Sequence, residues 1–327
     1  MKRVIALTLI VLATFFTVSM VMACKSAPPV EEPAPPEEPP PPPPPPPPPD
    51  EPPPPPEPEE EPPDMSPPEV SVTLSPQPFS PDGDGVDDIL NVSIAVQSAS
   101  PVHTWHIEIR EPEPPYVVFS QWDGEGMPPA SFTWDGTSDS GELVQSASDY
   151  HFALIVSNQY DNGIYQGIIS VDVLVRREGD VLRVIVPSIV FAPNAGDFKG
   201  LDQDKMANND KILRRIAEIL NKYDSYRVKV EGHANPTTAP GTKARANEEE
   251  GTKKVKGLRP LSDERAKTVV GYLVNLGVER DRLTPIGVGS ARTIVGYYKE
   301  DDKGKPTKAL NKDNWWKNRR VEFILEK

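Results

Sequence analysis

The stretch Leu261–Val278, LSDERAKTVVGYLVNLGV, decides how the C-terminal part of this 327-residue chain is interpreted. Its apolar residues recur at the spacing of one helical face, and Gly277 marks the expected end of the helix. Ser262 is the expected N-cap, which would place Arg265 in the first turn. The helix dipole favours anions in that turn, so a cation is out of place there. An anion that binds beside Arg265 would explain the placement.

Strand and helix signals alternate from Val181 to the C-terminus. The runs LRVIVPSIVF, YRVKVEGH, LTPIGVG and RRVEFILE have the character of strands, and NNDKILRRIAEILNKY has one apolar helical face. The predicted order is β-α-β-α-β-β, an α/β sandwich with helices on one face of a sheet. Between Ala234 and Leu261, a stretch with six basic residues and the run Glu248-Glu249-Glu250 fits no element and leaves room for a short helix. A loop of that length is usually functional or mobile.

Five motifs in this region carry a family resemblance: VFAPNAGDF, VKVEGHANP, LSDERAKTVVGYLVNLGV, RLTPIGVGSA and NRRVEFIL. In order and approximate spacing they resemble the OmpA-like peptidoglycan-binding domain, over nearly all of residues 181–327. The resemblance implies a non-catalytic module that holds the stem peptide of the cell wall. It would do so chiefly through the carboxylates and amine of the peptide's diamino acid.

The resemblance also assigns roles to single residues. Arg265 matches the family arginine that clamps a ligand carboxylate, for which a planar guanidinium is well suited. Arg319 corresponds to a second ligand-facing arginine, and Asn318 of the same motif joins the predicted set. Without the other motifs, Arg265 would be interpreted as a surface arginine paired with Glu264 or Asp263.

Two departures from the family pattern bear on ligand binding. The family usually reads GHTD, and its Asp receives the ligand's ammonium, whereas GHAN places Asn235 here. A neutral amide still accepts a hydrogen bond, but losing the charge costs about 1 kcal/mol or more, roughly five- to tenfold in affinity. Leu258 stands where the family often has Asn. A different diamino acid, a low affinity and lost binding are the three outcomes left open.

Other residues in or beside these motifs have a structural interpretation. His233 is expected to be a structural residue that ends its strand and not a metal ligand, since the other histidines that a metal site would need lie outside this region. At least one of Trp315 and Trp316 is expected in the core, with stacking on sugar faces as the alternative. Arg320 should point away from the side that Arg319 faces, because successive strand residues alternate.

Residues 69–178 predict a different fold. The short runs ILNVSIAVQ, HTWHIEIR, YVVFS, SFTW, YHFALIVS and IYQGIISVDVLV are separated by turn residues, and six or seven such strands predict an all-β sandwich. The segments FSPDGDGVDDIL and FTWDGTSDSGELVQSASDYHFALIV resemble the FlgD-Ig-like modules of bacterial envelope proteins. The turn Trp134-Asp135-Gly136 followed by Tyr150 carries this resemblance best, although Asp149 replaces the usual Gly. It implies a spacer or a module that binds a protein partner.

Four carboxylates crowd onto the loop DGDGVDD: Asp82, Asp84, Asp87 and Asp88. Oxygen ligands suit Ca²⁺, so a structural calcium site is one hypothesis. The loop is not an EF-hand, because its twelfth residue is Ser93 and not Glu. Asp and Gly are also ordinary turn formers, which is the alternative. No other cofactor is expected.

The N-terminal 23 residues have the pattern of an export signal, two basic residues followed by an apolar run. The only cysteine, Cys24, comes next, and VMAC resembles a bacterial lipobox, which implies lipidation of Cys24. An uncleaved membrane anchor is the alternative. Residues 24–68 are rich in Pro and Glu, which favours extended polyproline II and predicts a stalk, with a disordered tail as the alternative. The expected location is the cell envelope, as an outer-membrane lipoprotein facing the periplasm.

The net charge differs in sign between two parts of the chain. Residues 69–180 carry a net charge of −15 and residues 181–327 a net charge of +9, so the two parts are expected to meet different partners. A basic domain suits anions, and export argues against cytoplasmic nucleic acid as the partner. A lone cysteine excludes disulfides within the chain. No Ser/His/Asp set, Cys nucleophile or metal cluster indicates an enzyme.

Two main hypotheses follow. The first is a non-catalytic lipoprotein that tethers a membrane to peptidoglycan. The second is an adhesin-like surface or periplasmic interaction protein, in which the Ig-like module binds a partner and the terminal domain binds wall weakly or not at all. A flagellar stator-like role is weak, because residues 4–23 lack the carboxylate that ion conduction through a membrane needs.

Overall fold

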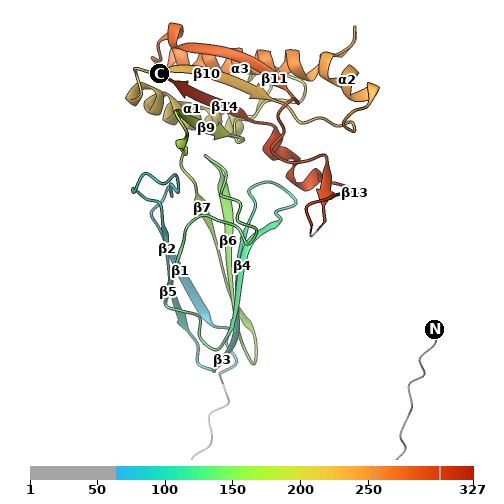
Figure 1. Cartoon of the computed structure of the whole chain (residues 1–327). Helices are drawn as coiled ribbons and strands as arrows, with labels where there is room; N and C mark the ends of the chain where they lie inside the picture. The colour runs from blue at the N-terminus through green and yellow to red at the C-terminus, as the bar shows by residue number, and fades with distance from the viewer. Residues whose placement is uncertain (1–63, 254, 302) are drawn as a thin grey trace, which may run out of the picture. The chain divides into compact units, whose positions relative to one another are not determined.

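The computed structural model describes residues 64–253, 255–301 and 303–327 (Figure 1). The predicted export signal, the lipidation of Cys24 and nearly all of the predicted stalk lie outside these ranges. Within the described ranges, no helix has both the length and the apolar character that crossing a membrane requires.

Residues 69–170 form two antiparallel sheets, as Figure 1 shows. The strand order is β1-β2-β5 in one sheet and β4-β3-β6-β7 in the other. Buried side chains of both sheets share one core, which includes Val92, Trp134 and Leu154. The all-β character predicted for this part is therefore confirmed. The strands are β1 (Glu69–Ser75), β2 (Leu90–Gln97), β3 (Val102–Arg110), β4 (Val118–Glu125), β5 (Ser131–Trp134), β6 (Asp149–Asn158) and β7 (Asn162–Ser170).

Strand β1 is absent from the predicted set. Its sequence EVSVTLS alternates apolar and polar residues, and its register places Val72 opposite Ile94 of β2. Prolines crowd both flanks of this run, and nearby proline lowers the expectation of a strand. Pairing with β2 along its whole length overrides that local signal.

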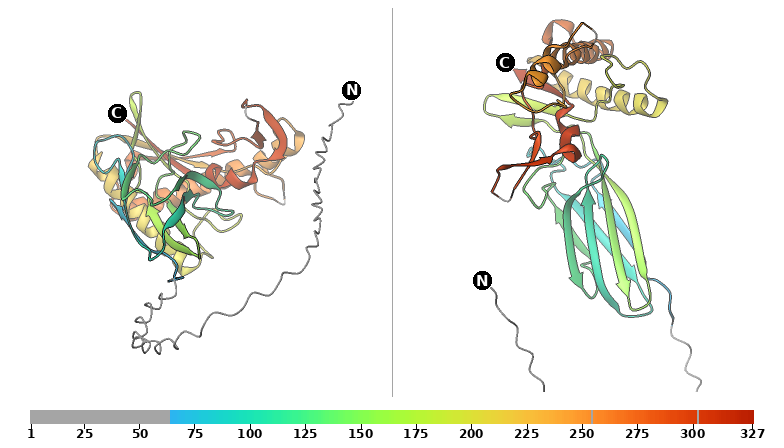
Figure 2. Two further views of the ribbon diagram at one scale, coloured as in Figure 1. Left: turned by 90° about the horizontal axis from the view of Figure 1, so that it is seen from below. Right: turned by 90° about the vertical axis from the view of Figure 1, so that its right-hand side faces the viewer.

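From Arg176 onward the chain builds a five-stranded sheet with two long helices packed against it (Figures 1 and 2). The strand order is β11-β10-β14-β9-β8; β10 and β11 run parallel, and the other neighbours antiparallel. Buried residues of sheet and helices share one core, among them Val230, Leu213 and Val269. The elements are β8 (Arg176–Glu178), β9 (Val181–Val186), α1 (Gln203–Lys222), β10 (Arg227–His233), α3 (Leu258–Asn275), β11 (Leu283–Gly289) and β14 (Val321–Glu326).

Strand β8 lies within the range predicted for the preceding module, yet it pairs with β9. Glu178 lies opposite Val181, so a two-residue turn joins the strands, and Gly179 supplies its positive φ of 62°. All three residues of β8 are exposed and polar, so no apolar pattern marks the strand in the sequence.

Further short elements interrupt the predicted order. The stretch with room for a short helix holds α2 (Lys243–Glu250), and Thr242 caps it by accepting a hydrogen bond from the Arg245 backbone N–H at 3.1 Å. Later in the chain, β12 (Tyr298–Glu300) pairs with β13 (Pro306–Leu310). Two 3₁₀ turns complete the set, η1 (Arg280–Arg282) and η2 (Lys312–Asn318).

Helix α3 begins at Leu258 with Gly257 as its N-cap, five residues before the predicted N-cap at Ser262. Pro260 obscures this start in the sequence, because proline usually marks a break. In a first turn proline is tolerated, since the backbone N–H that it lacks would have no helical partner there.

The predicted N-cap at Ser262 is therefore wrong. Ser262 is buried inside the helix, where its hydroxyl donates to the Arg259 carbonyl at 2.9 Å and accepts from the Gly289 N–H at 2.8 Å. Arg265 consequently lies in the second turn of α3, beyond the unpaired N–H groups of the helix start. The position of Arg265 must therefore be explained by the residues around it and not by the start of the helix.

Candidate ligand-binding groove

A groove of about 780 Å³ opens beside the first two turns of α3. The segments that follow β9 and β10 form part of its wall, and α2 forms another part. Arg265, Arg319 and Asn235 all line it, so three of the four predicted ligand-binding residues meet at one cavity. They converge because β14, which follows Arg319, pairs with β10, and α3 packs on β10.

Arg265 projects from α3 into this groove. Its Nε donates to the Ala195 carbonyl at 3.0 Å, and its guanidinium carbon lies 4.9 Å from the centre of the Phe191 ring. Burial lowers the pKa of Arg265 to about 10, and the positive charge of Arg319 adds to this shift. The guanidinium is thus held in a partly desolvated place beside a second cation.

The alternative interpretation of Arg265, pairing with a neighbouring acid, is wrong. Asp263 pairs with Lys267 at 2.6 Å, and Glu264 pairs with Lys256 at 2.5 Å. No carboxylate of the described residues lies within ion-pair distance of Arg265. Among the described residues, its charge therefore has no carboxylate counterion.

Arg319 follows η2 and is exposed, and no described carboxylate pairs with its side chain. Arg320 is buried instead, and its Nε donates to Glu322 Oε1 at 2.7 Å. The two neighbouring arginines thus have opposite environments, as predicted, although both precede β14 (Val321–Glu326). One lines the groove, and the other belongs to the interior of the sheet.

Asn318 does not offer free polar atoms to the groove. Its Oδ1 accepts from the backbone N–H groups of Ile294 and Val295, at 2.8 and 3.1 Å. Its Nδ2 donates to Asn235 Oδ1 at 2.9 Å and to the Val295 carbonyl at 3.1 Å. Asn235 in turn donates to the Pro236 carbonyl at 2.9 Å. Asn318 therefore fixes Asn235 and the segment 294–295, which makes it a positioning residue.

Lys317, directly before Asn318, is a buried cation with a side chain 1% exposed. Its ammonium donates to Glu111 Oε1 at 2.7 Å and to both carboxylate oxygens of Glu142, at 2.7 and 2.9 Å. Burial raises the pKa of Glu111, while Lys317 opposes that shift. Two carboxylates thus hold the backbone that leads into Asn318 and Arg319.

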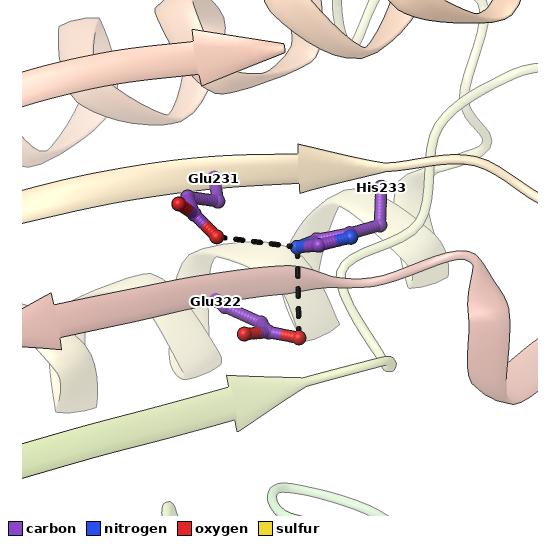
Figure 3. A group of neighbouring side chains, drawn as sticks. All are labelled: Glu231, His233 and Glu322. Carbon is purple, nitrogen blue, oxygen red and sulfur yellow. Dashed lines mark ion pairs between the residues drawn. The ribbon is translucent and has the colours of Figure 1, made fainter. Parts of the chain in front are cut away.

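His233 ends β10 and is buried, as predicted for a structural residue. Figure 3 shows its imidazole between a carboxylate of β10 and one of β14. Its Nε2 lies 3.6 Å from Glu231 Oε2 and 3.5 Å from Glu322 Oε1. Burial lowers the pKa of His233 to about 4, and the charge of Arg320 adds to the shift, whereas Glu322 opposes it.

These three side chains are close enough together to hold a metal ion, but both carboxylates are already engaged. Glu231 pairs with Arg292, and Glu322 with Arg183 and Arg320. Three guanidiniums against two carboxylates make the place unfavourable for a further cation. The cluster is a buried ion-pair network, and the register that sets Glu231 opposite Glu322 creates it.

The paired tryptophans before the arginine motif are packed against the protein. Trp316 is buried, as expected for at least one of them. Trp315 stacks on Tyr297, with ring centres 5.3 Å apart and an angle of 28° between the planes. Neither of them is among the residues that line the groove.

The acidic loop of the β-sheet module brings Asp82, Asp84 and Asp88 together, but not Asp87. Asp88 accepts the backbone N–H groups of Gly83 and Gly85, both at 2.7 Å. Asp82 and Asp84 also accept backbone N–H groups, which is the behaviour of turn formers. Calcium binding at this loop stays a prediction.

Glu248 also lines the groove and was not among the predicted site residues. The sequence marks it only as part of a run of three acids, which is usually a solvated surface. Its neighbour Glu249 has a different partner, the Ser290 hydroxyl at 2.7 Å. Because successive residues of a helix point in different directions, Glu248 and Glu249 of α2 bond to different segments.

Comparison with known protein families identifies part of this region. Residues 202–306 form an OmpA family domain. This confirms the resemblance seen in the motifs. The matched residues include α1, β10, α2, α3 and β11, and with them Asn235 and Arg265. Arg319 and β14 follow the matched range.

Curated relatives are similar to about a third of the chain. Peptidoglycan-binding protein ArfA of Mycobacterium bovis is 29% identical over 115 residues, and so is ArfA of Mycobacterium tuberculosis. The match covers 35% of this chain and 27% of ArfA, so it spans about a quarter of the relative's length.

Solved structures with similar domains include three bacterial proteins. The periplasmic domain of Helicobacter pylori MotB is 23% identical, with a TM-score of 0.33, and covers 46% of this chain and 80% of that one. The OmpA-like domain of Francisella tularensis FopA1 is 19% identical, with a TM-score of 0.30. The match covers 47% of this chain and 78% of that one. The peptidoglycan-associated lipoprotein of Burkholderia pseudomallei is 16% identical, with a TM-score of 0.27. The match covers 42% of this chain and 86% of that one.

Proposed function

We propose that this chain binds peptidoglycan non-covalently, through the groove of its OmpA family domain. One observation carries the proposal: Arg265 and Arg319 line the groove, and neither has a carboxylate partner among the described residues. Wall stem peptides are rich in carboxylates, and a guanidinium binds a carboxylate with two parallel hydrogen bonds. The printed name of ArfA, a peptidoglycan-binding protein, supports the same function.

In this proposal each groove residue has its own role in binding the ligand. Arg265 clamps a carboxylate of the stem peptide, and Arg319 supplies a second positive charge to the same ligand. Asn235 lines the groove beside them, and Asn318 holds Asn235 in place through the 2.9 Å hydrogen bond between their side chains. No step changes a covalent bond, so the domain acts as an anchor and not as an enzyme.

The proposal extends to a tether between wall and membrane. A lipid on Cys24, in the motif VMAC, would hold the N-terminus in a membrane. Some forty proline-rich residues at about 3.1 Å each would span on the order of 120 Å. The β-sheet module, an Ig-like sandwich in this proposal, acts as a further spacer, and the location is the periplasmic face of the outer membrane.

Co-sedimentation of the purified full chain with peptidoglycan sacculi tests wall binding. The wild type is expected to pellet with sacculi, and Arg265→Ala to stay mostly in solution. Arg214→Ala is the control, because it removes the same charge from an exposed site on α1 that does not line the groove. Equal pelleting of all three proteins would contradict the groove as the site. Pelleting by none would favour the hypothesis of an interaction protein.

A further inference from the structure

The groove presents both signs of charge. Arg265, Arg319 and Lys256 line it as cations, and Lys256 is already paired with Glu264 at 2.5 Å. Among the described residues that line the groove, Glu248 is the only carboxylate. A ligand that carries both carboxylate and ammonium groups would match this distribution better than a simple anion.

Glu248 projects from α2 and is fixed by the loop that follows β10. Its Oε1 accepts from the Thr237 backbone N–H at 2.7 Å and from the Thr237 hydroxyl at 2.6 Å. Its Oε2 accepts from the backbone N–H and the hydroxyl of Thr238. The side chain is 16% exposed, so the carboxylate is held at the groove wall and does not move freely in solvent.

This carboxylate is ionised at neutral pH. Burial acts to raise the pKa of Glu248, but the hydrogen bonds from Thr237 and Thr238 outweigh it, and the pKa is lowered. The nearest cation is Arg245, whose Nε lies 3.8 Å from Oε2. That Nε donates to the Thr238 carbonyl at 2.9 Å, so Arg245 does not bond the carboxylate directly. The hydrogen bonds to the Glu248 carboxylate come from Thr237 and Thr238, which are neutral donors, and not from a described cation.

Thr237 lies where a ligand in the groove could contact both its hydroxyl oxygen and the field of the Glu248 carboxylate. It lines the groove with Glu248, and its hydroxyl hydrogen points to the carboxylate. A hydroxyl that donates one hydrogen bond keeps two lone pairs for acceptance. An ammonium could therefore bond to the Thr237 hydroxyl oxygen while the carboxylate behind it stabilises the positive charge.

Asn235 is a weaker partner for an ammonium than a carboxylate would be. It is neutral, its Oδ1 accepts from Asn318, and its Nδ2 donates to the Pro236 carbonyl. We propose that Glu248, acting through Thr237, receives the free ammonium of the diamino acid in the wall stem peptide and so selects that ligand. This inference rests on the proposed wall binding and adds the residue that recognises the amine.

Calorimetric titration of the full chain with two synthetic peptides tests the inference. One is the stem tripeptide that ends in meso-diaminopimelate, and the other is the same peptide acetylated on its free side-chain amine. We expect the wild type to bind the free amine about tenfold more tightly, the typical effect of one charge-assisted hydrogen bond. Glu248→Gln should lose this preference and bind the acetylated peptide as the wild type does.

Two further variants separate ligand recognition from a structural role. Glu250→Gln removes the same charge from an exposed position of the same helix, so it should keep the wild-type preference. Glu248→Gln combined with Asn235→Asp should regain the preference, because a carboxylate returns to the groove wall. A residue that only held the loop would not be rescued in this way.

The outcomes distinguish this inference from the function on which it rests. Binding of both peptides by Glu248→Gln with the full tenfold preference would overturn the role of Glu248. Equal weakening of both peptides, without rescue by Asn235→Asp, would also overturn it and leave Glu248 a structural residue. If the wild type bound neither peptide, the proposed wall binding itself would fail. Arg265→Ala should weaken binding of both peptides alike.

Discussion

Arg265 and Arg319 line one groove, and neither guanidinium forms an ion pair with a carboxylate of the described residues. After burial, the charge of Arg319 is the next cause of the lowered pKa of Arg265, which falls to about 10. Two neighbouring cations without counterions destabilise each other in the unliganded protein. A bound carboxylate would relieve this repulsion, so the same feature favours ligand binding.

Arg265→Met is therefore expected to separate stability from binding. The variant removes a partly buried cation that has no carboxylate partner among the described residues, so the free energy of unfolding should stay within about 1 kcal/mol of wild type or rise. Binding to sacculi should be lost. Urea unfolding and co-sedimentation measure the two effects. Destabilisation by several kcal/mol would indicate that Arg265 serves the fold.

Asn235→Asp is expected to tighten binding to wall of the diaminopimelate type about five- to tenfold, because the carboxylate adds a charge-assisted hydrogen bond to the ligand's ammonium. The hydrogen bond that Asn318 donates can persist, since a carboxylate oxygen also accepts. The bond to the Pro236 carbonyl would be lost. Sedimentation across a range of sacculus concentrations measures the change, and unchanged or weaker binding would refute it.

His233 is expected to make the fold sensitive to acid. Its pKa is lowered from 6.5 to about 4, so the unfolded chain takes up a proton at higher pH than the folded one. The contribution is fully present above about pH 6.5 and is lost as pH falls toward 4, to a limit on the order of 3 kcal/mol.

The groups that face His233 are Glu231, Glu322, Arg320 and Arg292, and they make its protonation a property of the whole cluster. Urea unfolding between pH 4 and pH 7 measures the effect. His233→Gln should give a smaller loss of stability in this window than wild type. An identical pH dependence of the two proteins would show that another group is responsible.

Two glycine substitutions should change stability in opposite directions. A Cβ at Gly232 of β10 would lie well inside van der Waals distance of the Ser262 carbonyl oxygen of α3, so Gly232→Ala should destabilise by about 1–3 kcal/mol. Gly271 lies inside α3 with open space around its Cα, so Gly271→Ala should stabilise by about 0.5–1 kcal/mol. Thermal unfolding compares them, and a loss of stability in both would argue against this packing of α3 on β10.

Periodic apolar patterns explain how far the sequence could predict the fold. Ile212, Leu213 and Ile216 of α1 and Val269, Val270 and Leu273 of α3 are buried, because helical spacing brings each set to one face. Elements without such a face were missed. The exposed strand β8 and the short pair β12 and β13 owe their existence to backbone pairing, which composition does not reveal.

The residues of the groove could be predicted only where they belong to a family motif. Arg265 and Arg319 were expected at one site, and the structure places both at the groove. The sequence does not predict the role of Asn318, because its four side-chain hydrogen bonds go to Asn235 and to the segment 294–295, which are distant in the chain. Glu248 reaches the groove only because α2 folds over the loop that follows β10, a contact between segments that no periodicity encodes.

A crystal structure of the full chain with a wall stem peptide would test the central claim most directly. The account predicts a peptide carboxylate bonded to the guanidinium of Arg265, with Arg319 beside it. A peptide bound elsewhere, or a groove filled by the protein's own side chains while the peptide is absent, would contradict it.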